Sequence, residues 1–253
     1  MLVTGLMFDF TVVLSGVFAA AILRGFTGFG FGLAAVPLLS IVLPPAQVVP
    51  FVVVLQVIAG AGDLKQAARH CHWRAVKALY PGTLAGVPIG LAVLAFLPPT
   101  PVRLAIGLVI AASVLLLWRG ARLPPHPPWL LSAGTGLVSG VVSGLASMGG
   151  PPIVVYLLAL TLPALVVRST SIVYFMLSGL TALIPMAATG LIDRGILLWT
   201  VLALPVLFGG SWLGTRWFHR ALPHHHRATA LIVLSVLSVA LIARALVDWH
   251  RAS

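Results

Sequence analysis

Two glycine-rich runs interrupt the two longest apolar stretches of this 253-residue chain. The first is Arg24-Gly25-Phe26-Thr27-Gly28-Phe29-Gly30-Phe31-Gly32, and the second is Gly144-Leu145-Ala146-Ser147-Met148-Gly149-Gly150-Pro151-Pro152. Glycine lowers helix propensity, and the proline pair removes two amide donors and clashes with the preceding turn. We therefore expect each long stretch, 8–43 and 129–160, to be a broken helix or a hairpin of two shorter helices.

The apolar runs around these breaks have the lengths of bilayer helices, which need about 20 residues each. We delimit them as 8–43, 47–63, 76–97, 102–118, 129–160, 168–190, 195–216 and 228–247. Hydrophobic residues make up 60% of the chain and charged residues 8%, against about 25% charged residues in soluble domains. The sequence predicts an all-α, polytopic membrane bundle of about eight hydrophobic segments, with the lipid bilayer as its solvent.

The net charge of +11 comes from 15 Lys and Arg, which lie mostly between the apolar runs. Such loop charges set the orientation of a membrane protein, and no nucleic-acid-binding motif accompanies them. We therefore expect no nucleic acid partner. A single cysteine, Cys71, excludes an intrachain disulfide and a cysteine metal cluster.

Glycines and prolines recur in the same order in the two halves of the chain. Gly25 aligns with Gly144 and Gly30 with Gly149, and a slightly larger offset aligns further pairs: Pro81 with Pro205, Gly86 with Gly210 and Gly90 with Gly214. This is the pattern of a duplicated transporter fold, whose substrate site lies between the halves at the broken helices. We divide the chain into a first repeat, 1–125, and a second repeat, 126–253, within one membrane domain.

Loop charges predict the relative orientation of the repeats. The predicted loop 63–77 is basic, and we place it in the cytoplasm, whereas its counterpart around Asp193-Arg194 holds one basic residue. At the next pair of predicted loops the charge asymmetry is reversed: the loop of the first half is nearly uncharged, and its counterpart in the second half is basic. This favours an inverted repeat, in which each broken segment is a re-entrant hairpin or a pair of spans. A single crossing by each broken segment would make the repeats parallel.

The breaks also predict a binding site. Irregular backbone survives in hydrocarbon only where protein or a water-filled cavity satisfies it, and a helix resuming after a break presents free N–H groups that suit an anion. We expect the substrate near the main chain of the breaks, at Gly25, Gly28, Gly30, Gly32, Gly149, Gly150 and Pro151. The alternative is that these glycines only allow close helix packing.

Polar side chains near the breaks are further candidates. Arg24 follows a long apolar stretch with no acidic residue nearby in sequence, so its guanidinium is a candidate anion ligand. Arg168, beside Ser169-Thr170-Ser171, could bind an oxyanion or simply mark a helix start. Thr27, Ser143 and Ser147 could donate to an anion, although such hydroxyls often bond to their own helix carbonyls. Arg24 could instead be a charge at the headgroup level.

We expect no enzyme, no metal and no cofactor. The four carboxylates all fall near segment ends, and no nucleophile–base or metal-ligand spacing stands inside a predicted helix. The absence of an intramembrane carboxylate favours uniport or anion exchange over proton symport.

The two motifs resemble those of the sulfite exporter TauE/SafE family of bacterial permeases. The resemblance rests on residues 24–33 with Pro37-Leu38-Leu39, on Gly149-Gly150-Pro151-Pro152 with Tyr156, on 81–90, and on Arg168 with Tyr174-Phe175, and it covers nearly the whole chain. It implies a multi-pass bacterial inner-membrane protein that moves sulfur-containing anions. At Ala146-Ser147-Met148 the chain departs from the glycine-rich stretch common in the family.

These observations together predict a secondary transporter, an exporter, of a small anion such as sulfite or an organosulfonate. The alternatives are a non-transporting membrane scaffold subunit and a carrier of another small solute. A homo-oligomer is compatible with the sequence.

Overall fold

The computed structural model describes residues 2–39, 43, 45–96, 108, 111–112, 115, 118–119, 122–147, 149–220, 232, 235–236 and 239. Every regular element within these residues is a helix. Most of the predicted segments 102–118 and 228–247 lies outside the described residues.

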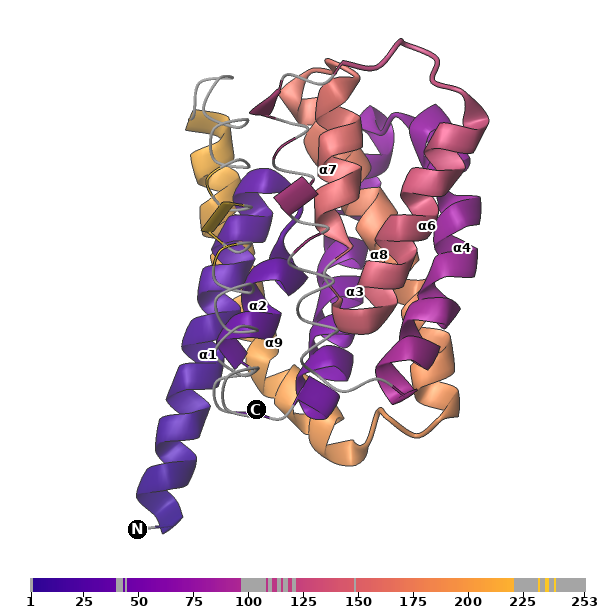
Figure 1. Ribbon diagram of the computed structural model, residues 1–253. Helices are drawn as coiled ribbons and strands as arrows, with labels where there is room; N and C mark the ends of the chain where they lie inside the picture. Colours follow the sequence, from indigo (N-terminus) through magenta and orange to yellow (C-terminus); the bar gives the residue numbers. More distant parts are fainter. Residues whose placement is uncertain are drawn as a thin grey trace.

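The helices are α1 (Leu2–Thr27), α2 (Phe31–Leu39), α3 (Pro45–His70), α4 (Trp73–Phe96), α6 (Trp129–Ala146), α7 (Gly150–Ala159), α8 (Ala164–Ala188) and α9 (Arg194–Arg220). Four of the described helices, α3, α4, α8 and α9, are long and apolar enough to cross a membrane. They pack side by side with the other described helices (Figure 1). The prediction of a helical membrane bundle is confirmed, and both predicted breaks separate two helices.

Each break folds the chain back on itself. In the first hairpin, a Cβ on Gly16 of α1 would lie 3.1 Å from Leu39 at the end of α2, and a Cβ on Gly30 would lie 3.3 Å from Leu23. In the second, Ser132 of α6 is hydrogen-bonded to Tyr156 of α7 at 2.7 Å. The partner helices therefore run antiparallel, so α1–α2 and α6–α7 are hairpins.

The hairpins begin at opposite ends of the bundle. The α3–α4 turn lies beside the start of α8, because the His72 amide donates to Thr170 at 2.9 Å. The segment before α6 lies at this same end, where Arg74 of α4 is 3.3 Å from His126. We call it the basic end, after Arg69, Arg74, Lys77, Arg216 and Arg220. The first hairpin opens at the other end (Figure 1). Gln47 and Asp193 line one pocket there.

Glycine contacts between the halves exchange in pairs. Gly60 of α3 packs on Met176 of α8, while Gly179 of α8 packs on Val57 of α3. Likewise α9 packs on α1 and α4 on α6. A Cβ on Gly214 would lie 2.1 Å from the Ile22 carbonyl, and a Cβ on its counterpart Gly90 would lie 2.1 Å from the Val141 carbonyl. The exchanged contacts and the opposed hairpins support the inverted repeat, which stays a proposal together with its boundary at 125/126.

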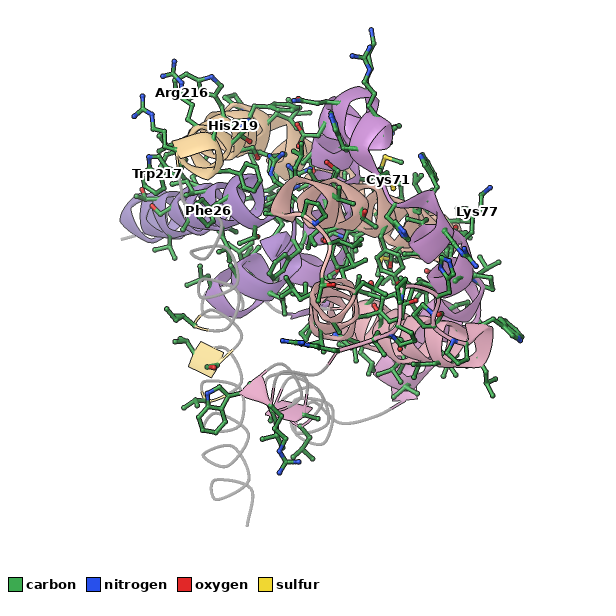
Figure 2. The ribbon with its side chains drawn as sticks, turned by 90° about the horizontal axis from the view of Figure 1, so that it is seen from above. Phe26, Cys71, Lys77, Arg216, Trp217 and His219 are labelled. Atoms are coloured by element: carbon green, nitrogen blue, oxygen red, sulfur yellow. The ribbon has the colours of Figure 1, made fainter. Side chains whose placement is uncertain are left out.

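One predicted boundary is wrong. We expected a loop over 63–77, but α3 continues to His70 and α4 begins at Trp73, so only Cys71 and His72 connect them. Hydropathy falls after Asp63 because the last turns of α3 reach the basic end and carry charged side chains. The backbone nevertheless stays helical as far as His70. Seen from this end, Cys71 and Lys77 lie on one side of the bundle, and Arg216 and His219 on another (Figure 2).

Candidate anion site at the helix breaks

The first break is built by two glycines and one hydroxyl. Gly28 and Gly30 have φ angles of 78° and 90°, in the left-handed region that favours glycine. The Thr27 Oγ1 accepts the Phe29 amide at 3.2 Å and lies 2.8 Å from the Leu23 carbonyl, to which it donates. Helix α2 then begins at Phe31, and the amides of its first turn have no carbonyl acceptor within the helix.

The second break is built differently. Ser147 ends α6 in the left-handed conformation, with φ 54°, and its amide donates to the Ser143 carbonyl. Helix α7 begins at Gly150, with prolines in its first turn. Because Pro151 and Pro152 lack amide hydrogens, the start of α7 offers fewer donors than the start of α2. The two predicted helix N-termini are therefore unequal.

The tips of the two hairpins touch. A Cβ on Gly32 would lie 2.0 Å from the Ser147 carbonyl oxygen, and a Cβ on Gly150 would lie 3.0 Å from Leu33. A small pocket lies beside this contact. Its lining comprises Arg24, Gly28, Phe29, Gly30, Phe31, Gly32, Leu33, Gln56, Gly60, Ser147, Gly150, Ile172, Phe175 and Met176.

Ser147 has an unpartnered hydroxyl at this pocket. The residue is 6% exposed, and its Oγ has no hydrogen-bond partner among the described residues. A buried hydroxyl without a partner forgoes about 1–3 kcal/mol, which a ligand or water would recover. Of the three such hydroxyls among the described residues, on Ser147, Ser171 and Ser211, only that of Ser147 belongs to a residue that lines the pocket. Gln56, which also lines the pocket, uses one amide donor on the Phe175 carbonyl at 3.2 Å.

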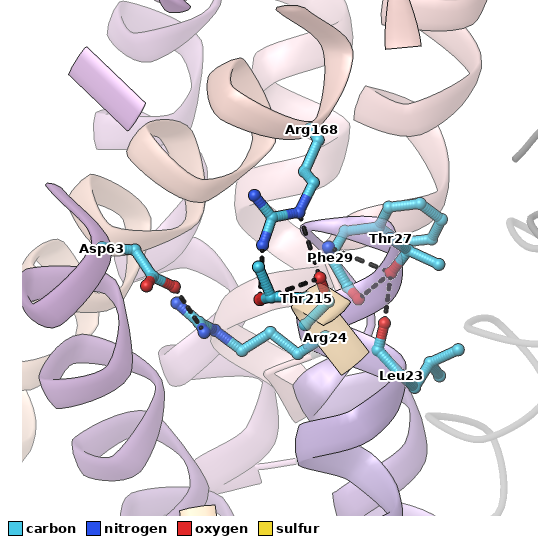
Figure 3. Close-up of polar contacts among 8 residues, drawn as sticks. Leu23, Arg24, Thr27, Phe29, Asp63, Arg168 and Thr215 are labelled. Carbon is cyan, nitrogen blue, oxygen red and sulfur yellow. Dashed lines mark hydrogen bonds and ion pairs between the residues drawn. The ribbon is translucent and has the colours of Figure 1, made fainter. Parts of the chain in front are cut away.

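The sequence-based expectation that Arg24 lacks a carboxylate partner is wrong. Its Nη1 lies 2.9 Å from Oδ2 of Asp63, 39 positions further along the chain. Figure 3 shows the two side chains meeting between α1 and α3. Arg24 is 5% exposed and lines the pocket, whereas the Asp63 side chain is 39% exposed. Asp63 also corrects the expectation that all carboxylates lie at segment ends, since α3 extends to His70.

Arg168 serves the packing of the first hairpin. Its Nε donates to the Gly25 carbonyl at 3.0 Å and its Nη2 to the Thr215 hydroxyl at 2.9 Å (Figure 3). Its guanidinium also lies 4.9 Å from the centre of the Phe218 ring. The side chain is buried but is not part of the pocket lining. Arg168 therefore ties α8 to α1 and α9 behind the first break.

The structure separates the predicted site residues into two groups. The pocket is lined by Arg24, Gly28, Gly30, Gly32, Ser147 and Gly150, and is not lined by Gly25, Thr27, Ser143, Gly149, Pro151 or Arg168. Several of the second group have structural contacts. Gly25 packs on Ser211, Ser143 is 3.0 Å from Ser178, and the Gly149 carbonyl accepts from Ser139. For these residues the packing alternative describes the geometry better.

Sequence reasoning gave too little weight to residues from the long helices. Gln56 and Gly60 of α3, with Ile172, Phe175 and Met176 of α8, close the pocket from the side. In sequence only Gln56 stands out, as a polar side chain within an apolar segment and a weak candidate; the others are ordinary residues of apolar helices. Only the antiparallel packing of α3 on α8 brings them to the breaks.

A bundle in which two broken helices meet at a small pocket with a buried cation defines a class, the membrane transporters with discontinuous helices. The chain belongs to the sulfite exporter TauE/SafE family, which matches residues 12–241. It is thus a multi-pass inner-membrane transporter.

Two relatives are similar over most of their length. The "Probable sulfite/organosulfonate exporter TauE" of Cupriavidus necator is 30% identical over 230 residues, covering 88% of this chain and 90% of the relative. The "Probable inner membrane transporter protein TsaS" of Comamonas testosteroni is 30% identical over 178 residues, covering 66% and 71%. No solved structure gives a significant match.

Proposed function

We propose that the chain exports a small sulfur-containing oxyanion, sulfite or an organosulfonate, and binds it in the pocket between the two hairpin tips. The observation that carries the proposal is the unpartnered Ser147 hydroxyl, buried in a pocket that also holds the start of α2 and the Arg24 guanidinium. Hydroxyl, amide and guanidinium groups are all hydrogen-bond donors, which suits an oxyanion and disfavours a cation.

The family supports the substrate class, since the Cupriavidus relative is named for sulfite and organosulfonate export. The opposed hairpins support an alternating-access cycle, in which the repeats rock around a fixed central site. We place the basic end in the cytoplasm, following the positive-inside rule. The proposal gives the chain no catalytic role and needs no metal or cofactor.

The test compares two buried hydroxyls. Ser147→Ala and Ser147→Gly each remove the pocket hydroxyl, and the glycine variant also suits the positive φ. Ser171→Ala is the matched control, because Ser171 is also buried and unpartnered but does not line the pocket. A hydrogen bond to a charged group contributes about 1.5–3 kcal/mol, so both Ser147 variants should weaken binding of radiolabelled sulfite by about 10–150-fold.

Saturable sulfite flux in proteoliposomes that survives Ser171→Ala and falls in both Ser147 variants would support the proposal. Equal flux in all variants would move the site away from the hairpin tips. No flux of sulfite or sulfoacetate through well-folded wild-type protein would favour the scaffold alternative.

A further inference from the structure

Arg24 and Asp63 form an ion pair at the edge of the pocket, and the two partners differ in their freedom to move. Arg24 is 5% exposed and lines the pocket, whereas the Asp63 side chain is 39% exposed and is not part of the lining. The Asp63 carboxylate can therefore leave Arg24 and be solvated by water. The buried guanidinium can be neutralised and hydrogen-bonded only by protein groups or by a ligand in the pocket.

No other described Lys or Arg side chain lines this pocket. Arg168 is close enough to interact electrostatically with both Arg24 and Asp63. Its Nε and Nη2, however, donate to the Gly25 carbonyl and the Thr215 hydroxyl, and its side chain does not line the pocket. Among the described residues, an anion entering the pocket thus meets one cation, and that cation already has an internal anion.

The equivalent positions of the second half are uncharged. The offset that pairs Gly60 with Gly179 places Ser143 opposite Arg24 and Ala182 opposite Asp63. Ser143 is joined to Ser178 by a neutral hydrogen bond of 3.0 Å. The second hairpin is therefore held next to α8 without charges. Packing alone does not account for the ion pair between the first hairpin and α3.

We propose that Asp63 is an internal competitor of the transported anion. In the empty pocket Asp63 neutralises Arg24; the entering anion displaces the carboxylate and takes over the guanidinium; on release, Asp63 returns. The inference rests on the proposed function and deepens it, because it makes Asp63 the residue that sets how tightly the anion is held. Competition weakens binding and speeds release, which a carrier needs in order to turn over.

The test measures the Kd for radiolabelled sulfite in purified protein with Asp63→Asn, which keeps the shape of the side chain and removes its charge. Coupling between two ligands typically amounts to about 5–150-fold, and we expect Asp63→Asn to lower Kd about tenfold and to slow sulfite release. Asp193→Asn is the matched control. Asp193 lines a different pocket, at the end of the bundle opposite the basic end, and caps α9 by accepting a hydrogen bond from the Ile196 amide. The Kd of Asp193→Asn for sulfite should therefore equal that of the wild type.

A second comparison keeps the test decisive if Asp63→Asn does not fold. In the Arg24→Gln background, Asp63 is an unpaired carboxylate near the pocket, and adding Asp63→Asn should restore part of the lost affinity. Where Asp63→Asn also folds with Arg24 present, the gain in affinity should be larger there, since the loss of competition for the guanidinium adds to the loss of repulsion. A purely structural Asp63 would show no gain in either background.

The outcomes separate the two proposals. Wild-type protein that binds sulfite, with a Kd that Asp63→Asn leaves unchanged or raises, would overturn the role of Asp63 and leave the proposed function standing. Wild-type protein that binds neither sulfite nor sulfoacetate would overturn the proposed function and this inference with it.

Discussion

The contact between the hairpin tips can be tested with a single methyl group. In Gly32→Ala, the new Cβ would lie 2.0 Å from the Ser147 carbonyl oxygen. Ordinary van der Waals contact begins at 3.4 Å, so the tips must separate by more than an ångström. The obstructing atom belongs to the backbone and cannot rotate away. Overpacking of this kind costs about 1–3 kcal/mol, occasionally more, and it also displaces the start of α2 from the pocket.

The assay combines thermal unfolding in detergent, followed by fluorescence of the seven tryptophans, with sulfite flux in proteoliposomes. Gly134→Ala is the matched control, since a Cβ on Gly134 would meet no atom of the described residues within 4 Å. Because alanine favours a helix over glycine by about 1 kcal/mol, the control should be as stable as wild type or more so. Gly32→Ala should lower both the melting temperature and the flux. Wild-type stability and flux in Gly32→Ala would refute the tip-to-tip contact.

Two further predictions concern helix packing and the basic end. Gly214→Ala should destabilise the protein by about 1–3 kcal/mol, measured by thermal unfolding, because its Cβ would lie 2.1 Å from the Ile22 carbonyl. Gly209→Ala on the same helix should not, because its Cβ would meet no atom of the described residues within 4 Å. Burial raises the pKa of the Cys71 thiol, so less thiolate is present at neutral pH. A membrane-impermeant maleimide should therefore label Cys71 more slowly than a free thiol, faster as the pH rises, and only from the cytoplasmic side; labelling from the outer side would reverse our orientation.

Sequence reasoning located the breaks because local chemistry determines them. Clustered glycines and the proline pair interrupt a helix wherever they occur, so the breaks at 28–30 and 147–149 could be predicted without tertiary information. The helix ends were harder to predict. Asp63 marks a fall in hydropathy, but a polar sequence can continue a helix at the membrane surface, and α3 does so to His70.

The site was only partly predictable, because its decisive contacts join distant segments. Arg24 and Asp63 are 39 positions apart and meet only when α3 packs beside the first hairpin. For the same reason sequence could not tell that Arg168 would reach the Gly25 carbonyl, 143 positions away. The unpartnered state of Ser147 is likewise a property of the packed structure, since its neighbours in sequence say nothing about where its hydroxyl points.

The most direct test of the anion site is to locate a bound anion. Selenite, the selenium analogue of sulfite, can be bound to the purified protein and its selenium located in a crystal by anomalous scattering, in protein that contains ordinary methionine. We predict one selenium position between the Ser147 hydroxyl, the start of α2 and the Arg24 guanidinium. Selenium bound elsewhere, for example in the pocket of His72, Arg74 and His126 at the basic end, with the hairpin tips empty, would contradict the account.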